Sequence, residues 1–119
     1  MSTNRALRIP DYLDYILQAI ARIKSYTHDM TEAVFLCDEK TQDAVIRNIE
    51  IVGEAARNVE RNHPDFAAQY SDVPWAIAYE MRNALAHGYF KVDFEIVWKT
   101  IENDLPGLER QILLIRTQI

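Results

Sequence analysis

The sequence is poor in cysteine and glycine, with one cysteine (Cys37) and three glycines among 119 residues. A single cysteine excludes an internal disulfide. So few glycines leave no flexible linker and no glycine-rich phosphate loop, and zinc-ligand spacings and the nucleophile elbow of serine hydrolases are missing as well. We therefore expect no metal and no cofactor. Cys37 lies in an apolar stretch, which predicts a buried or half-buried thiol rather than a nucleophile.

Long apolar runs and positive charge are also scarce. No stretch approaches the roughly 20 residues of a membrane span, and the N-terminus lacks the apolar core of a secretory signal, so we expect a cytoplasmic protein. The 13 Lys and Arg residues are outnumbered by 18 Asp and Glu, for a net charge of −5. This balance argues against non-specific nucleic-acid binding, which normally uses a basic face. An RNA ligand would require the few cations to be focused in one groove, or a structured RNA recognised over a small area.

The sequence does show the periodicity of helices. Apolar side chains recur at steps of three and four residues in four segments, the pattern of helices that bury one face. The first segment runs from Pro10 to about His28, and the second runs from a cap at Asp38 to about Asn62. The third begins at a cap formed by Ser71 or Asp72 and has Pro74 in its first turn. The fourth begins at a cap formed by Asp93 and runs toward the C-terminus. The sequence Pro106-Gly107 should kink or split the last segment.

Two short stretches connect these segments. Thr31 should cap a turn that buries Val34 and Phe35, and residues 65–70 should form a single turn. No strand pattern or internal repeat appears. We predict the all-α fold class: one domain, residues 1–119, forming a four- to five-helix up-and-down bundle.

The stretch Met81–Tyr89 gathers a permanent cation, a proton-transfer group and a phenol within about two helical turns. Arg82 and His87 are five residues apart, so on a regular helix they point about 140° away from each other. The arginine and histidine of a single chain are therefore poorly placed to contact the same ligand. Two copies around a two-fold axis would place the arginine and histidine of both chains around one shared groove, which predicts a homodimer.

The neighbours of this pair support a site at the end of a helix. Asn83 lies one turn from His87 on the same face. Ala78, Met81 and Leu85 repeat at three and four residues and should form the buried stripe. Gly88 is a natural helix terminator.

Arginine and histidine together suit metal-free cleavage of a phosphodiester. The guanidinium of Arg82 is a planar fork that fits phosphate oxygens. The imidazole of His87 can take the proton of a ribose 2′-hydroxyl or protonate the leaving oxygen. Asn83 would orient the histidine or hold a phosphate. Since the nucleophile is the 2′-hydroxyl, we expect RNA rather than DNA as the substrate.

The pattern Arg82-x-x-x-x-His87-x-Tyr89, with Asn83 after the arginine, resembles the signature of the HEPN superfamily of ribonucleases. The closer similarity is to the HepT-like toxin branch. Two flanking blocks resemble that branch as well, and the order of the segments agrees. The blocks are Ile49-Glu50-Ile51-Val52-Gly53-Glu54-Ala55 and Trp98-Lys99-Thr100-Ile101-Glu102-Asn103-Asp104-Leu105-Pro106.

The resemblance implies an all-helical, HEPN-like homodimer that acts as an RNA-cleaving toxin. It also implies a partner, a minimal nucleotidyltransferase antitoxin (MntA-like) that can attach AMP to the motif tyrosine, by position Tyr89. By the same resemblance, Glu54 would point toward Arg82 and position it.

Plainer interpretations remain open. Arg82 could pair with Glu80 or Asp93, and His87 could merely cap a helix. The protein could be a non-catalytic helical dimer that binds a nucleotide or docks a nucleotidyltransferase.

Other polar residues have plain interpretations too. Glu54 could belong to a solvated row of ion pairs with Glu50, Arg57 and Arg61. The acidic pairs Asp93/Glu95 and Glu102/Asp104 are better explained as helix caps and surface charge than as metal ligands. His28 and His63 should be surface residues.

Overall fold

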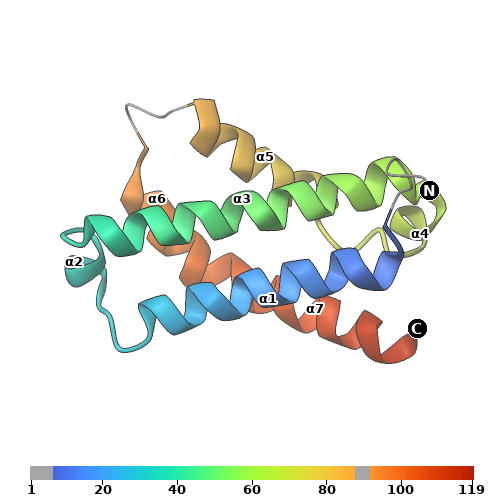
Figure 1. Cartoon of the computed structure of the whole chain (residues 1–119), viewed down its shortest axis with the longest axis horizontal. Coiled ribbons are helices and arrows are strands. Elements are labelled where there is room, and N and C mark those ends of the chain that lie inside the picture. Colours follow the sequence, from blue (N-terminus) through green and yellow to red (C-terminus); the bar gives the residue numbers. More distant parts are fainter. Residues whose placement is uncertain (1–6, 88–91) are drawn as a thin grey trace, which may run out of the picture.

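Four long helical segments alternate in direction through the computed structural model (Figure 1). The structure describes residues 7–87 and 92–119, and of residues 82–87 it describes the helical backbone alone. The long segments are α1 (Ile9–Thr27), α3 (Glu39–Asn62), α5 (Trp75–His87) and the consecutive elements α6 (Phe94–Lys99), η1 (Thr100–Asp104) and α7 (Leu105–Gln118). The short helices α2 (Glu32–Phe35) and α4 (Pro64–Gln69) connect them. The described ranges contain no strand, which confirms the all-α prediction.

Polar caps fix where three of these helices begin, and all three were predicted. The side chain of Asp38 accepts a hydrogen bond from the amide of Thr41 at 3.0 Å. Thr31 accepts from Val34 in the same way at 3.3 Å, and Asp93 accepts from Glu95 at 3.0 Å. Each cap satisfies an amide that has no partner inside its helix, so the boundaries follow from local chemistry.

The core lies where α1, α3 and the α6–α7 segment meet. Their buried positions follow the three- and four-residue steps seen in the sequence. The buried residues of these seams are Leu13, Ile16, Ile20, Ile23, Val45, Ile49, Val52, Ala56, Val59, Val97, Leu105, Leu108, Ile112 and Ile115. None of the helices in the described part of the chain combines the length and apolar content needed to span a bilayer.

Three local expectations were wrong. Val34 is 51% exposed, because the single turn of α2 directs only Phe35 into the core. Cys37 follows in the turn after α2 and is exposed rather than buried. The helix α5 begins at Trp75, so neither Ser71 nor Asp72 caps it. Pro74 lies before its first turn, with its carbonyl accepting from the Ala78 amide at 3.0 Å.

The last segment is not split at Pro106-Gly107. Instead, η1 forms one π turn ahead of the proline, in which the Leu105 amide donates to the carbonyl of Thr100. Proline has no amide hydrogen, and its ring crowds the carbonyl four residues earlier. A wider turn before Pro106 lets the chain remain helical, and it places the buried Thr100 beside α5.

Leucines on opposite faces of α7 provide a test of the packing. Leu108 is 8% exposed and Leu114 is 61% exposed. We expect Leu108→Ala to lower the free energy of unfolding by about 2–5 kcal/mol, because it leaves a cavity in the core. The matched change Leu114→Ala should alter it by less than about 0.5 kcal/mol. Urea denaturation measures both, and equal losses would contradict this packing.

The Asp38 cap provides a pH-dependent test. The hydrogen bonds from the Thr41 amide and hydroxyl lower the pKa of Asp38 from its ordinary 3.8. The ionised cap therefore stabilises the fold above that ordinary value, and its contribution is lost as the pH falls through the lower folded-state pKa. Asp38→Asn should lower the Tm by a degree or two at pH 7 and should have no effect in stronger acid. Asp43→Asn removes the same charge from an exposed position of α3 and is the control.

Candidate active site

The predicted catalytic residues belong to α5, which lies along α3 at the edge of the bundle (Figure 1). Arg82, Asn83 and His87 fall in the C-terminal half of this helix. Their side chains, and Tyr89 and Gly88 altogether, lie outside the described residues. The backbone of residues 82–87 is helical, as the interpretation of the motif assumed. The contacts of the Arg82 and His87 side chains stay a prediction.

Four contacts of described residues hold α5 in place. At its start, the indole nitrogen of the buried Trp75 donates to the Tyr70 carbonyl at 3.1 Å. One turn further on, the guanidinium of Arg57 in α3 lies 5.9 Å from the centre of the Tyr79 ring. This cation–π contact joins the two helices near the motif.

The remaining contacts lie on the inner side of α5. Ala78 and Met81 are partly buried against the core, as predicted, whereas Leu85 of the same predicted stripe lies among the residues without described side chains. The hydroxyl of Thr100 in η1 lies 4.0 Å from the Met81 sulfur. Because Met81 directly precedes Arg82, the π turn supports the helix at the point where the motif begins.

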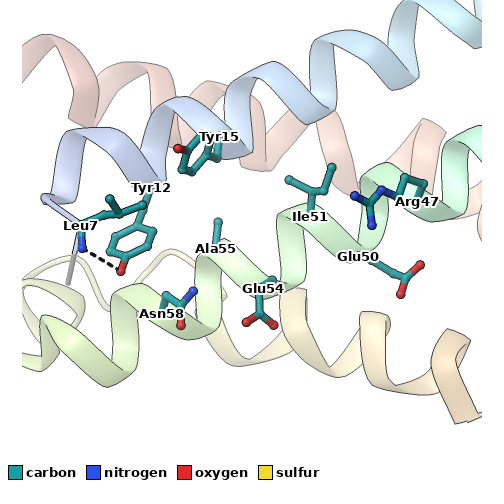
Figure 2. Close-up of a pocket in the computed structure, with 9 residues that line it drawn as sticks. All are labelled: Leu7, Tyr12, Tyr15, Arg47, Glu50, Ile51, Glu54, Ala55 and Asn58. Carbon is teal, nitrogen blue, oxygen red and sulfur yellow. Dashed lines mark hydrogen bonds between the residues drawn. The ribbon is translucent and has the colours of Figure 1, made fainter. Parts of the chain in front are cut away.

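Glu54 lies on the part of α3 beside which α5 runs. Its side chain is drawn on the side of α3 that faces α5, next to Glu50 one turn earlier (Figure 2). A role in positioning Arg82 requires this placement. The contact itself involves a side chain outside the described residues, so it stays a prediction.

A shallow groove of about 450 Å³ runs along the outer face of α3 toward the start of α1 (Figure 2). Arg47 and Asn58 lie toward its two ends on α3, and Tyr15 of α1 stands at its edge with 46% of its surface exposed. This groove was not predicted from the sequence. One available signal was Tyr15, a large aromatic side chain out of phase with the buried stripe Leu13–Ile16–Ile20.

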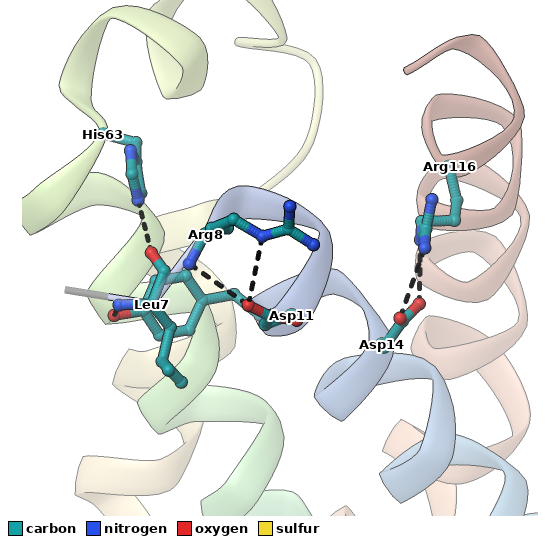
Figure 3. Close-up of polar contacts among 7 residues, drawn as sticks. Leu7, Arg8, Asp11, Asp14, His63 and Arg116 are labelled. Atoms are coloured by element: carbon teal, nitrogen blue, oxygen red, sulfur yellow. Dashed lines mark hydrogen bonds and ion pairs between the residues drawn. The ribbon is translucent and has the colours of Figure 1, made fainter.

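A polar cluster closes the groove at the start of α1. The Tyr12 hydroxyl accepts from the Leu7 amide at 3.2 Å and from the Asn62 side chain at 3.0 Å. The Nε2 atom of His63 lies 2.9 Å from the Leu7 carbonyl and donates to it (Figure 3). His63 lies at the surface, as predicted, but the sequence did not predict its contact with Leu7, which forms because the residues before α1 fold back onto the end of α3.

Ion pairs fix the opposite edge of α1 to α7. Arg116 donates to Asp14 at 2.9 Å (Figure 3), and this hydrogen bond raises the pKa of Arg116. Lys24 reaches Glu109 at 3.1 Å. These contacts hold α7 along α1 (Figure 1).

Metal ligation finds no support among the described side chains. Within the described ranges no three His, Cys, Asp or Glu side chains come together as ligands would. Asp93 caps α6, as predicted, and accepts from the Glu95 and Ile96 amides.

Comparison with known protein families shows which family the chain belongs to. A family model described as "Ribonuclease HepT-like" matches residues 16–115. The chain belongs to this family. The match confirms the resemblance drawn from the motif, and it spans α3, α5 and the π turn.

Relatives of this HepT-like chain cover most of its length. A protein of Thermococcus cleftensis named "Probable ribonuclease HepT" is 42% identical over 106 residues, which cover 89% of this chain and 94% of the relative. A protein of Methanocaldococcus jannaschii named "Putative RNase" is 40% identical over 101 residues, or 85% of this chain and 81% of its own length.

A longer relative from the same organism is named "Gamma-glutamylcyclotransferase and putative RNase". It is 41% identical over 108 residues, which cover 91% of the HepT-like chain and 47% of that protein. The similarity is therefore to about half of a larger polypeptide. No solved structure matches the chain significantly.

Proposed function

We propose that this HepT-like protein is a metal-independent endoribonuclease toxin of a toxin–antitoxin system. The observation that carries the proposal is the family match over residues 16–115, which contains the whole pattern Arg82-x-x-x-x-His87-x-Tyr89. The backbone from Arg82 to His87 lies on α5, at the edge of the bundle. A cytoplasmic location fits an RNA substrate.

The reaction proceeds by attack of a ribose 2′-hydroxyl on the adjacent phosphorus. The new bond joins the 2′-oxygen to phosphorus, and the bond to the 5′-oxygen of the next nucleotide breaks. One His87 takes the 2′-hydroxyl proton and the other gives a proton to the leaving 5′-oxygen. Arg82 stabilises the charge that gathers on the remaining phosphate oxygens. The products are a cyclic phosphate on the 5′ fragment and a free 5′-hydroxyl.

The mechanism requires two chains. Acid and base are separate tasks, and each chain has one His87. The angle of about 140° between Arg82 and His87 on a regular helix also keeps one chain from surrounding a phosphate. A homodimer resolves both points because it repeats the motif across a two-fold axis. In this groove Asn83 orients the histidine or holds a phosphate, and Glu54 positions Arg82.

A minimal nucleotidyltransferase antitoxin (MntA-like) would silence this site by attaching AMP to Tyr89. The adenylyl group adds bulk and negative charge two residues after His87. The added bulk would block an RNA phosphate from binding at that position, and the added charge would repel it.

RNA cleavage by the purified protein tests the proposal. We expect cleavage in the presence of EDTA, because neither step uses a metal. His87→Ala and Arg82→Ala should each lower the rate by about 100-fold or more, since each removes a group that acts in the transition state. His28→Ala and Arg110→Ala remove the same residue types from exposed positions and should leave the rate unchanged. Gel analysis of a labelled RNA measures the rate and identifies the cyclic phosphate.

Two results would contradict the proposal. Persistent cutting by both motif variants would show that the activity belongs to a contaminant or to another site. Loss of activity with EDTA, restored by a divalent cation, would show that a metal takes part.

Co-expression with the antitoxin tests the modification. Mass spectrometry should find the added mass of AMP on the peptide that contains Tyr89, and Tyr89→Phe should abolish it because the acceptor oxygen is gone. The control is Tyr79→Phe, which removes the hydroxyl of a tyrosine of α5 that lies ten residues earlier in the sequence. AMP on any other residue would be the contrary result.

The alternative function is a non-catalytic helical dimer that binds a nucleotide or docks a nucleotidyltransferase. The observation that favours it is the net charge of −5, which weakens attraction to RNA. The two functions differ in the cleavage assay, since only the ribonuclease produces a cyclic phosphate.

A further inference from the structure

The edge between α3 and α5 contains a cation for which the proposed reaction gives no use. The two helices lie side by side (Figure 1), and the Arg57 guanidinium of α3 lies over the Tyr79 ring of α5, 5.9 Å from its centre. Among the residues whose contacts the structure describes, none forms an ion pair or a hydrogen bond with this guanidinium. No described residue therefore occupies its N–H donors.

This guanidinium lies near the start of the catalytic motif. Tyr79 precedes Arg82 by three residues on the continuous helix α5. Residues three apart on a helix are neighbours, with Cβ atoms about 5–6 Å from each other. A ligand that is bound at Arg82 and continues along the edge of α5 therefore meets Arg57 within about one helical turn.

The Tyr79 ring prepares Arg57 to bind a ligand. A long side chain loses conformational entropy when a ligand fixes it, which weakens binding. Arg57 and Tyr79 are both half-buried, and their contact already restricts the arginine before a ligand arrives. The ring attracts the positive charge through its π face and accepts none of the N–H groups that lie in the plane of the guanidinium. These donors suit the paired oxygens of a phosphate.

We propose that Arg57 binds a backbone phosphate of the RNA next to the phosphate at Arg82. The inference rests on the proposed function for the role of Arg82, and it adds a second phosphate subsite. It also gives the strand a path, from the motif along the edge of α3 toward the start of α5. An RNA strand fits two neighbouring arginines because it carries a phosphate at every nucleotide. A single anion would need only one of them.

The surrounding charges limit this subsite to one phosphate. Glu54 lies three residues before Arg57 and has a contact of its own. Glu60 lines a groove that faces α4, and Glu80 is exposed on α5. These carboxylates prevent a broad basic field, in keeping with the net charge of −5. Binding at Arg57 therefore depends on direct hydrogen bonds to one phosphate rather than on long-range attraction.

The salt dependence of RNA binding tests the subsite. The probe is a fluorescently labelled single-stranded RNA of mixed sequence, and the parent chain carries His87→Ala so that the RNA stays intact. Adding Arg57→Gln should raise the Kd at least about tenfold. It should also reduce the slope of log Kd against log salt by about 0.7, the value of one phosphate contact with a single strand. Fluorescence anisotropy measures both quantities.

Two further variants provide the controls. Arg57→Lys keeps the charge and should keep the slope, although it loses the planar fork and part of the affinity. Arg110→Gln removes an arginine from an exposed position of α7 and should change neither the Kd nor the slope. Circular dichroism checks that each variant is folded.

A third variant separates RNA binding from support of α5. Tyr79→Leu removes the same cation–π contact and leaves the cation, so it should keep the slope of the parent chain. If Arg57 only held α5 in place, Arg57→Gln and Tyr79→Leu would weaken binding equally and both would keep that slope. Should Arg57→Gln fail to fold, phenylglyoxal modification of the parent chain takes its place. RNA should then protect Arg57 and not Arg110, as measured by mass spectrometry.

Several outcomes would overturn the inference. These are a parent chain that does not bind the RNA, a folded Arg57→Gln variant with an unchanged Kd and slope, or an equal loss in Arg110→Gln. The pattern of a purely structural contact, or modification of Arg57 that RNA does not reduce, would do the same. Because binding is measured without cleavage, the two proposals can fail separately. Binding through Arg57 by a chain that never cleaves RNA would remove the ribonuclease and leave the subsite, and cleavage with no effect of Arg57→Gln on binding would do the reverse.

Discussion

The packing of α5 against α3 is the contact on which the candidate site depends. The backbone of the motif belongs to α5, so anything that fixes this helix fixes the position of Arg82 and His87 relative to the bundle. The Arg57–Tyr79 contact holds α5 to α3, and the π turn at Thr100 supports it at Met81. α3 in turn is held by α1 along its buried seam. α3 thus packs against α1 in the core and also supports α5, the helix that carries the candidate site.

Much of the fold follows from local sequence. The seams of α1, α3 and α7 and the caps at Asp38 and Asp93 were predicted because helix period and capping need only neighbouring residues. The errors have a common origin in contacts between distant segments. Whether Cys37 is buried depends on which residue of a four-residue helix faces the core. The partners of His63 come from a segment 56 positions earlier in the chain.

The candidate site, like the fold, could be predicted from local sequence only in part. The spacing of Arg82, His87 and Tyr89 within two turns is a local signal, and the family match over 16–115 agrees with it. The groove on α3 is built by two helices, and its contributors Tyr15 and Arg47 are 32 positions apart, so no local pattern joins them.

The proposed active site is a groove that two chains build together and that uses both His87 imidazoles. The most direct test mixes wild-type protein with His87→Ala after subunit exchange, at constant total concentration, and measures RNA cleavage. If one imidazole is the base and the other the acid, mixed dimers are inactive, and the rate falls with the square of the wild-type fraction to about a quarter at equal mixing. A linear decline, to about half at equal mixing, would show that each chain acts alone and would contradict the account.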